Sequence, residues 1–224
     1  DPRSMREGQE LMGWGMATGV WEAMQMPASA KACLEPDGRL MVSSATADIG
    51  TGTYTVMTQI AAAAMGVALD KVEFRLGDSS LSQAPLEGGS ATVSSVGSAV
   101  QQACALLQAK VLDAVQQFPG SPFAGASLDD VTFAEGRLML KRDPTVHVDL
   151  GEVVRSNGTL EAEARVEPGE KRKEWATATH SAVFVEVRVD EALGTIRVAR
   201  VVSAIAAGRV VSPKTAGNQI VGGG

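Results

Sequence analysis

The spacing of hydrophobic and polar residues changes several times along the first half of the chain. Each change marks the boundary of an expected strand, turn or helix. Residues 28–34 and 39–47 lie on either side of the turn signal "EPDG", so they predict a hairpin. Good helix formers fill Thr53–Met65, and "KVEFRLGD" then alternates as a strand does. After a loop, a second and longer helix is predicted over Ser90–Gln117, where "FPGSP" stops it.

Spacing within the two helical stretches predicts which side chains face a core. In the shorter helix the inward positions recur every four residues, at Val56, Ile60 and Ala64, and Gly66 follows as a residue suited to end a helix. In the longer helix the apolar positions near one face are Val93, Val100, Cys104, Leu107, Val111 and Val115. Both helices are therefore expected to pack on strands.

The second half of the chain predicts a smaller β-rich part followed by the most regular strands. "VTFAEGRLML" reads as a short hairpin, "DLGEVVRSNG" as a brief helix capped by Asp149, and "TLEAEARVEP" as a strand. The charged "EPGEKRKEWAT" is expected to be a solvated loop. "HSAVFVEVRVD" and "GTIRVARVVSAIAAG" alternate as two paired strands, and a last helix begins at Ser212 and Pro213.

These elements define an α+β chain with mixed sheets and two long helices. We expect three parts: residues 1–126 with both long helices, a β-rich insertion over 127–168, and 169–224, which packs back on the first part.

Composition narrows the classes of partner. The 224 residues are 45% hydrophobic and carry a net charge of −6, and the longest basic cluster is Lys171-Arg172-Lys173, so neither nucleic acid nor an anionic membrane is an expected partner. No apolar run approaches the ~20 residues of a membrane helix. Only two cysteines and two histidines are present, too few for a recognisable metal or catalytic cluster.

The segment before each long helix is richer in hydrogen-bonding groups than a cap requires. "DIGTGTYT" precedes the first helix and "EGGSATVSSVGSAV" opens the second. Free N–H groups at a helix start attract anions, and glycine lets a phosphate reach the backbone, so the pair suits a ligand with several phosphates. Thr55 replaces the third glycine of a dinucleotide fingerprint, and no P-loop ending is present. The alternative is that both glycine segments are structural turns, with Thr51 or Thr53 as cap.

Three longer stretches carry a family resemblance. In order and spacing, "DIGTGTYTVMTQIAAAAMG…VEFRLGDSS", "GGSATVSSVGSAVQQAC" and "FVEVRVDEALGTIRVARVVSAIAAGRVVSPKTAGNQIVGG" resemble the molybdenum-binding large subunit of the xanthine dehydrogenase and aldehyde oxidoreductase family. The opening "DPRSMREGQELMGWGMATGVWEAMQMPASAKACL" is similar to its bacterial aldehyde-oxidising branch.

The resemblance implies a fold, a cofactor and a set of contacts. The fold would be part of the molybdopterin-binding domain of a molybdenum hydroxylase, and the cofactor would be molybdenum-molybdopterin cytosine dinucleotide. Gly50, Thr51, Gly52 and Thr53 would line the pterin and its phosphate. The second segment would approach the metal side and the dinucleotide through Gly89, Ser90, Ala91 and Thr92, with Ser94 and Ser95 nearby. Gln219 stands at a further contact position, although Asn218 precedes it where the family has glycine.

The implied reaction oxidises aldehydes or hydroxylates aromatic heterocycles with oxygen from water, alongside iron–sulfur and FAD subunits or domains. The family's glutamate base belongs to a Gly-x-Gly-Glu segment that these residues do not contain, so no catalytic residue or metal ligand is assigned. We therefore expect a fragment that is inactive alone and holds little cofactor. Two other hypotheses stay open at this point: a non-enzymatic α+β domain, and an unrelated nucleotide-binding module.

Overall fold

The structure is a computed structural model that describes residues 3–223, apart from the side chains of residues 171 and 173. The described strands are β1 (Arg6–Glu7), β2 (Glu10–Glu22), β3 (Ala28–Leu34), β4 (Leu40–Ser43), β5 (Val72–Arg75), β6 (Val131–Ala134), β7 (Arg137–Leu140), β8 (Asp143–Asp149), β9 (Leu160–Val166), β10 (Ala178–Asp190) and β11 (Thr195–Ala206). The helices are α1 (Thr53–Met65), α2 (Thr92–Gln116), α3 (Leu150–Asn157) and α4 (Pro213–Gly223), with short 3-10 turns at Leu69–Lys71, Leu128–Asp130 and Glu170–Glu174. The predicted α+β class with two long helices is confirmed.

The chain forms two compact units from interleaved segments. One unit holds the stretch up to Ala23, Lys171–Val210 and the stretch from Ile220, and the other holds Met24–Glu170 with Val211–Gln219. The three-part division into 1–126, 127–168 and 169–224 stays a prediction.

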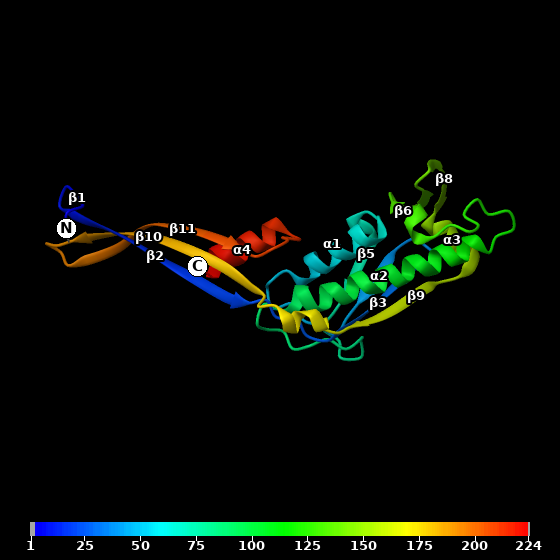
Figure 1. Cartoon of the computed structure of the whole chain (residues 1–224), viewed down its shortest axis with the longest axis horizontal. Helices are drawn as coiled ribbons and strands as arrows, with labels where there is room; N and C mark the ends of the chain where they lie inside the picture. Colours follow the sequence, from blue (N-terminus) through cyan, green and yellow to red (C-terminus); the bar gives the residue numbers. More distant parts are fainter. Residues whose placement is uncertain (1–2, 224) are drawn as a thin grey trace. The chain divides into compact units, whose positions relative to one another are not determined.

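The larger unit is built on a mixed sheet with the strand order β5-β4-β3-β9. β4 and β5 are parallel and α1 connects them, while β3 is antiparallel to both of its neighbours. α1 packs on β4 and β5, α2 packs on β3 and β9, and the two helices lie side by side (Figure 1). β3 is buried along its length except for Lys31, whose ammonium group lies 2.7 Å from a carboxylate oxygen of Glu161.

The first helix begins and ends at residues 53 and 65, as predicted from the sequence. Gly66 follows it in the left-handed conformation and donates its N–H to the carbonyl of Ala62, which satisfies an otherwise free helix-end carbonyl. Of the predicted inward stripe, Val56 is buried, while Ile60 and Ala64 are only partly buried. The α1 residues in the core cluster are Met57, Ala61 and Met65, each one position further along the helix.

The second helix begins two residues later than predicted, at Thr92. Five of its six predicted inward residues are buried, whereas Val93 is 43% exposed. Val93 lies in the first turn, where little of the chain covers it.

A small sheet of order β6-β7-β8 sits beside α3. The hairpin of β6 and β7 and the helix after Asp149 are confirmed, although the Asp149 side chain makes no capping hydrogen bond. β8 was not predicted from the sequence. The hairpin touches the end of α1, because the N–H of Gly136 donates to the carbonyl of Gly66 at 2.8 Å.

The smaller unit is a sheet of order β1-β2-β10-β11. The predicted pair of β10 and β11 is confirmed, with a bulge after Glu186. The expected charged loop contains the short turn Glu170–Glu174. β2 is a long strand that the sequence analysis did not predict, and it pairs antiparallel with β10 along its whole length. Among residues 3–223 no helix has the length and hydrophobicity to cross a bilayer.

Candidate functional site

The loop between β4 and α1 is organised by Asp48. Oδ1 of its carboxylate accepts the backbone N–H groups of Gly50 at 2.9 Å and Gly52 at 3.2 Å, and Oδ2 accepts that of Tyr54 at 3.2 Å. Gly52 is the N-cap residue of α1, where no side-chain capping bond forms. The alternative interpretation had Thr51 or Thr53 as the helix cap; that detail is wrong, because Asp48 satisfies the free amides from further upstream.

The environment of Asp48 keeps it ionised. Partial burial by itself would raise the pKa of the carboxyl, but hydrogen bonds from the backbone of Tyr54, Gly50, Gly52 and Thr51 lower the pKa below its ordinary value. The backbone of this loop thus converges on an oxygen anion, and in this structure that anion is the chain's own carboxylate.

The two glycines of the loop have different constraints. Both have positive φ, 96° at Gly50 and 86° at Gly52. A Cβ at Gly52 would lie 2.8 Å from Cγ2 of Thr215 in α4, whereas a Cβ at Gly50 would meet nothing within 4 Å. The hydroxyl oxygens of Thr51 and Thr53 lie 3.4 Å apart, and Thr53 is buried. Gly52 is therefore fixed by packing, and Gly50 opens to solvent.

The second loop has two consecutive residues in the left-handed conformation, Gly89 (φ 64°) and Ser90 (φ 60°). Both are exposed, and a Cβ at Gly89 would lie 2.6 Å from Cε of Met24. Ala91 is buried as the N-cap residue of α2, and Thr92 begins the helix. A left-handed serine is uncommon, so this turn is held by its surroundings.

The hydroxyl groups of Ser94 and Ser95 form hydrogen bonds within the chain. Ser94 Oγ donates to the carbonyls of Met24 at 2.5 Å and Ala91 at 2.9 Å. Ser95 Oγ accepts the N–H of Met26 at 2.9 Å. Both serines therefore hold the segment before β3 against the first turn of α2.

The two loops lie at the same end of the larger unit, where both helices begin (Figure 1). Thr46 Oγ1 donates to Oε2 of Glu87 at 3.1 Å, and the N–H of Ala45 donates to the carbonyl of Ser82 at 2.7 Å, so bonds between the two connecting segments fix their separation. The expectation that Gly50–Thr53 and Gly89–Thr92 act as one site stays a prediction. Gln219 is exposed on α4, whose Thr215 touches Gly52.

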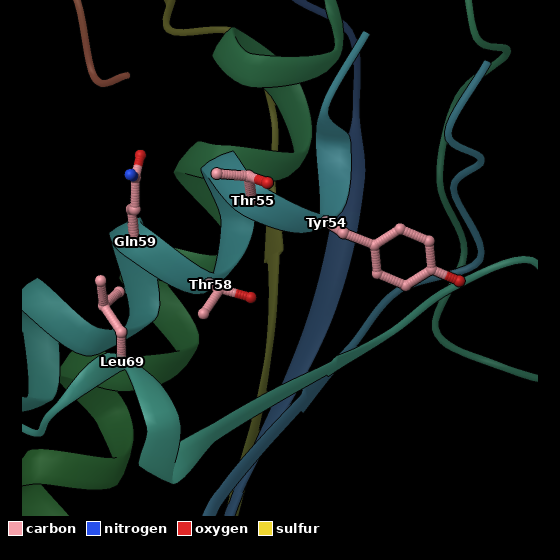
Figure 2. Close-up of a pocket in the computed structure, with 5 residues that line it drawn as sticks. All are labelled: Tyr54, Thr55, Thr58, Gln59 and Leu69. Atoms are coloured by element: carbon pink, nitrogen blue, oxygen red, sulfur yellow. The ribbon is translucent and has the colours of Figure 1, made fainter. Parts of the chain in front are cut away.

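An open hollow lies on the outward face of α1, beside the first loop. Figure 2 shows its lining residues, Tyr54, Thr55, Thr58 and Gln59 on α1 and Leu69 after it. Oε1 of Gln59 is buried with no hydrogen-bond partner among the described residues. None of the residues that were predicted to contact the cofactor lines this hollow.

The described residues contain no cluster of three or more His, Cys, Asp or Glu side chains that could hold a metal ion. Cys33 and Cys104 are buried free thiols.

Comparison with known proteins identifies the family to which the chain belongs. The family model for the molybdopterin cofactor-binding domain matches residues 1–224, and the chain belongs to that family. The family resemblance stated from the sequence is confirmed.

Particular relatives agree in sequence and in fold. The chain is 35% identical over 222 residues to the aldehyde oxidoreductase molybdenum-binding subunit PaoC of Escherichia coli, a match that covers 99% of this chain and 28% of that protein. Quinoline 2-oxidoreductase from Pseudomonas putida 86 has a similar fold, with a TM-score of 0.84 at 19% identity over 96% of this chain and 29% of that one. CO dehydrogenase from Oligotropha carboxidovorans has a TM-score of 0.80 at 20% identity, over 96% of this chain and 28% of that one. The chain thus spans less than a third of the length of these proteins.

Proposed function

We propose that this chain is the part of a molybdenum hydroxylase that holds the cofactor in its cytosine dinucleotide form, and that the complete enzyme oxidises aldehydes with oxygen from water. The relative named an aldehyde oxidoreductase subunit, which is 35% identical, favours aldehydes over aromatic heterocycles as substrates. Iron–sulfur and FAD subunits or domains would carry the electrons away.

The observation that carries the proposal is the convergence of the Gly50, Gly52 and Tyr54 amides on the Asp48 carboxylate. Because Asp48 occupies these amides, the loop is held as a fixed turn in which the exposed Gly50, without a side chain, lets a phosphate approach the backbone at the start of the helix. Bound there, the cofactor would supply the redox-active metal centre for the oxidation.

The chain's own residues divide into two roles in this proposal. Contacts to the pterin and phosphates come from the two helix starts and from α4, that is from Gly50, Thr51, Gly52 and Thr53 at α1, Gly89, Ser90, Ala91 and Thr92 at α2, and Gln219 on α4; Thr53 and Ala91 are buried and can contribute only through their backbone. Ser94 and Ser95 hold the second loop in place, since their hydroxyl groups bond to the backbone of Met24 and Met26.

A matched pair of substitutions at Gly50 tests the site. Gly50→Asp and Gly50→Asn share their size and the strain of a positive φ, and neither Cβ meets another atom, so the pair differs mainly in charge. In the complete protein, we expect Gly50→Asp to lose at least tenfold in molybdenum and cytidine nucleotide content, because a second carboxylate repels phosphate. Gly50→Asn should keep most of the cofactor.

Elemental analysis and mass spectrometry of the purified proteins measure the two contents, and Tm shows that both variants fold equally well. Equal cofactor content in the two variants would contradict the loop assignment. An unsubstituted protein without any nucleotide would favour the non-enzymatic domain, and nucleotide without molybdenum would favour an unrelated nucleotide-binding module.

A further inference from the structure

The two faces of the β2-β10-β11 sheet differ in charge. Directly paired residues of an antiparallel sheet share a face. Glu186 pairs with Trp14 and Arg200, and Arg188 pairs with Met12 and Arg197, so these charged side chains are on one face. All the charged residues of β2, β10 and β11 have this parity, including Glu10, Glu22 and Asp190.

Several charged residues of the charged face form ion pairs with one another. Glu186 accepts from Arg188 at 2.9 Å and lies 3.5 Å from Arg200, while Arg197 donates to Glu10 at 2.8 Å. The Arg200 guanidinium also stacks 4.8 Å from the centre of the Trp14 ring.

The opposite face, which we call the uncharged face, has no ionisable carboxylate, ammonium or guanidinium group on any of the three long strands. β10 contributes Val183, Val185, Val187 and Val189 to it, and β11 contributes Val198 and Val201. The β11 side chains are exposed, 62% at Val198 and 50% at Val201. A contiguous apolar surface of this kind marks a packing surface.

Small residues shape this face along β2. Gly13, Gly15, Ala17 and Gly19 lie on it in sequence, paired with the β10 residues from Val187 to Ser181. A Cβ at Gly13 would lie 3.0 Å from Cγ2 of Val187, whereas a Cβ at Gly15 would meet nothing within 4 Å. Side chains on β2 therefore project less from this face than the valines of β10 and β11 do, so another element can approach the β2 backbone closely.

We propose that the uncharged face packs against an apolar segment of the same polypeptide that lies outside residues 1–224. The chain covers only 28% of the curated relatives, which leaves ample further chain to supply that segment. The lack of charge on the face favours a permanent apolar contact, since a transient partner would gain orientation from charges that this face does not offer.

Cysteine labelling of the complete polypeptide tests the proposal. Val201→Cys places a thiol on the uncharged face, and Leu193→Cys places one in the turn before β11, where Leu193 is 75% exposed. We expect the thiol at 201 to react with a maleimide at least tenfold more slowly than the thiol at 193, as measured on the labelled peptides by mass spectrometry. Equal rates would overturn the proposal.

A photoreactive amino acid, p-benzoylphenylalanine, incorporated during synthesis in place of Val201 identifies what covers the face. Cross-links to residues of the same polypeptide outside 1–224 support the proposal. Cross-links to residues 24–170, to a second copy or to another subunit would overturn it.

Gly15→Val supplies a second measurement that does not depend on thiol chemistry. Within the sheet a Cβ at this position would meet nothing within 4 Å, and valine has a better strand propensity than glycine. A fall in the Tm of the complete polypeptide therefore supports a segment in close contact with β2, and an unchanged or higher Tm would count against one.

Discussion

Asp48 holds three backbone amides before α1, and its removal has consequences that can be separated by the choice of substitution. Asp48→Ala leaves the amides without a partner, so we expect the chain to lose about 1 kcal/mol of stability, the usual cost of a lost helix cap. Asp48→Asn keeps one acceptor oxygen and should lose less. Urea unfolding at neutral pH measures both. A larger loss for Asn than for Ala would contradict this account of the loop.

The same residue predicts a pH dependence with a definite sign. Because the folded pKa of Asp48 is lowered from 3.8, its stabilising contribution is complete above that value and is lost as the pH falls through the lower folded pKa. The difference in stability between the unsubstituted chain and Asp48→Asn should therefore shrink on acidification below pH 3.8. Urea midpoints of the two proteins at a series of pH values check this, and a difference that stays constant down to strongly acidic pH would contradict it.

At single residues the sequence indicated the two glycine-rich helix starts but not their polar contacts. The structure adds that Gly50, Gly52 and Gly89 all have positive φ, a conformation that favours glycine. The role of Asp48 was missed, although an aspartate two residues before a glycine is a typical turn signal. The partners of Ser94 and Ser95 could not be predicted, because Met24 and Met26 are distant in sequence and only the packed structure brings them close.

At the scale of elements, the end of α1 depends on a close approach between two backbones. A Cβ at Gly66 would lie 2.1 Å from the carbonyl oxygen of Phe133, and φ there is 61°. Gly66→Ala should therefore separate α1 from the β6-β7 hairpin and destabilise the chain by well over ~1 kcal/mol, the cost of the left-handed conformation alone.

Gly77→Ala is the matched control for that substitution. Gly77 also has a positive φ, 81°, but its Cβ would meet nothing within 4 Å, so it should show only the conformational cost of about 1 kcal/mol. Urea unfolding of the two variants separates strain from collision. Equal losses would mean that the hairpin moves aside without cost.

The elements that the sequence predicted well have local signals. α1 lies between two glycines, and both of its ends were predicted. β2 was missed because Gly13, Gly15 and Gly19 lower its strand propensity and because its partner β10 follows only at Ala178. The alternation of these glycines with Met12, Trp14 and Met16 has a period of two, and it could have identified the strand.

At the scale of the whole molecule, both thiols are buried. Burial raises the pKa of Cys104 to about 12, which lowers its thiolate fraction at pH 8 about 10³-fold. The pKa of Cys33 is raised first by burial and then by nearby Glu161 and Glu35. We expect neither thiol to react with iodoacetamide at pH 8 in the folded chain, and both to react in urea.

Peptide mass spectrometry after timed labelling measures these rates. Since both cysteines belong to the larger unit, their labelling reports the opening of that unit. Rapid labelling of Cys104 without denaturant would contradict the buried position of α2.

Fold class and family could be predicted from the sequence because they depend on the order of the elements and on motifs that recur in order. The pairing of strands across the chain could not. β2 and β10 form one sheet although the whole of Met24–Glu170 lies between their segments, and no local pattern encodes that distance. The binding roles of Gly50–Thr53 and Gly89–Thr92 stay predictions.

The interleaving of the two units also sets an order of events on the ribosome. β2 leaves the exit tunnel before its long partner β10, which follows only after residues 24–170 have been made; at ordinary rates of synthesis this takes on the order of ten seconds. During that interval the tryptophans of β2, Trp14 and Trp21, have no completed sheet to join, while the larger unit can already fold. The nascent chain therefore presents a long unpaired strand to chaperones before the smaller unit can close.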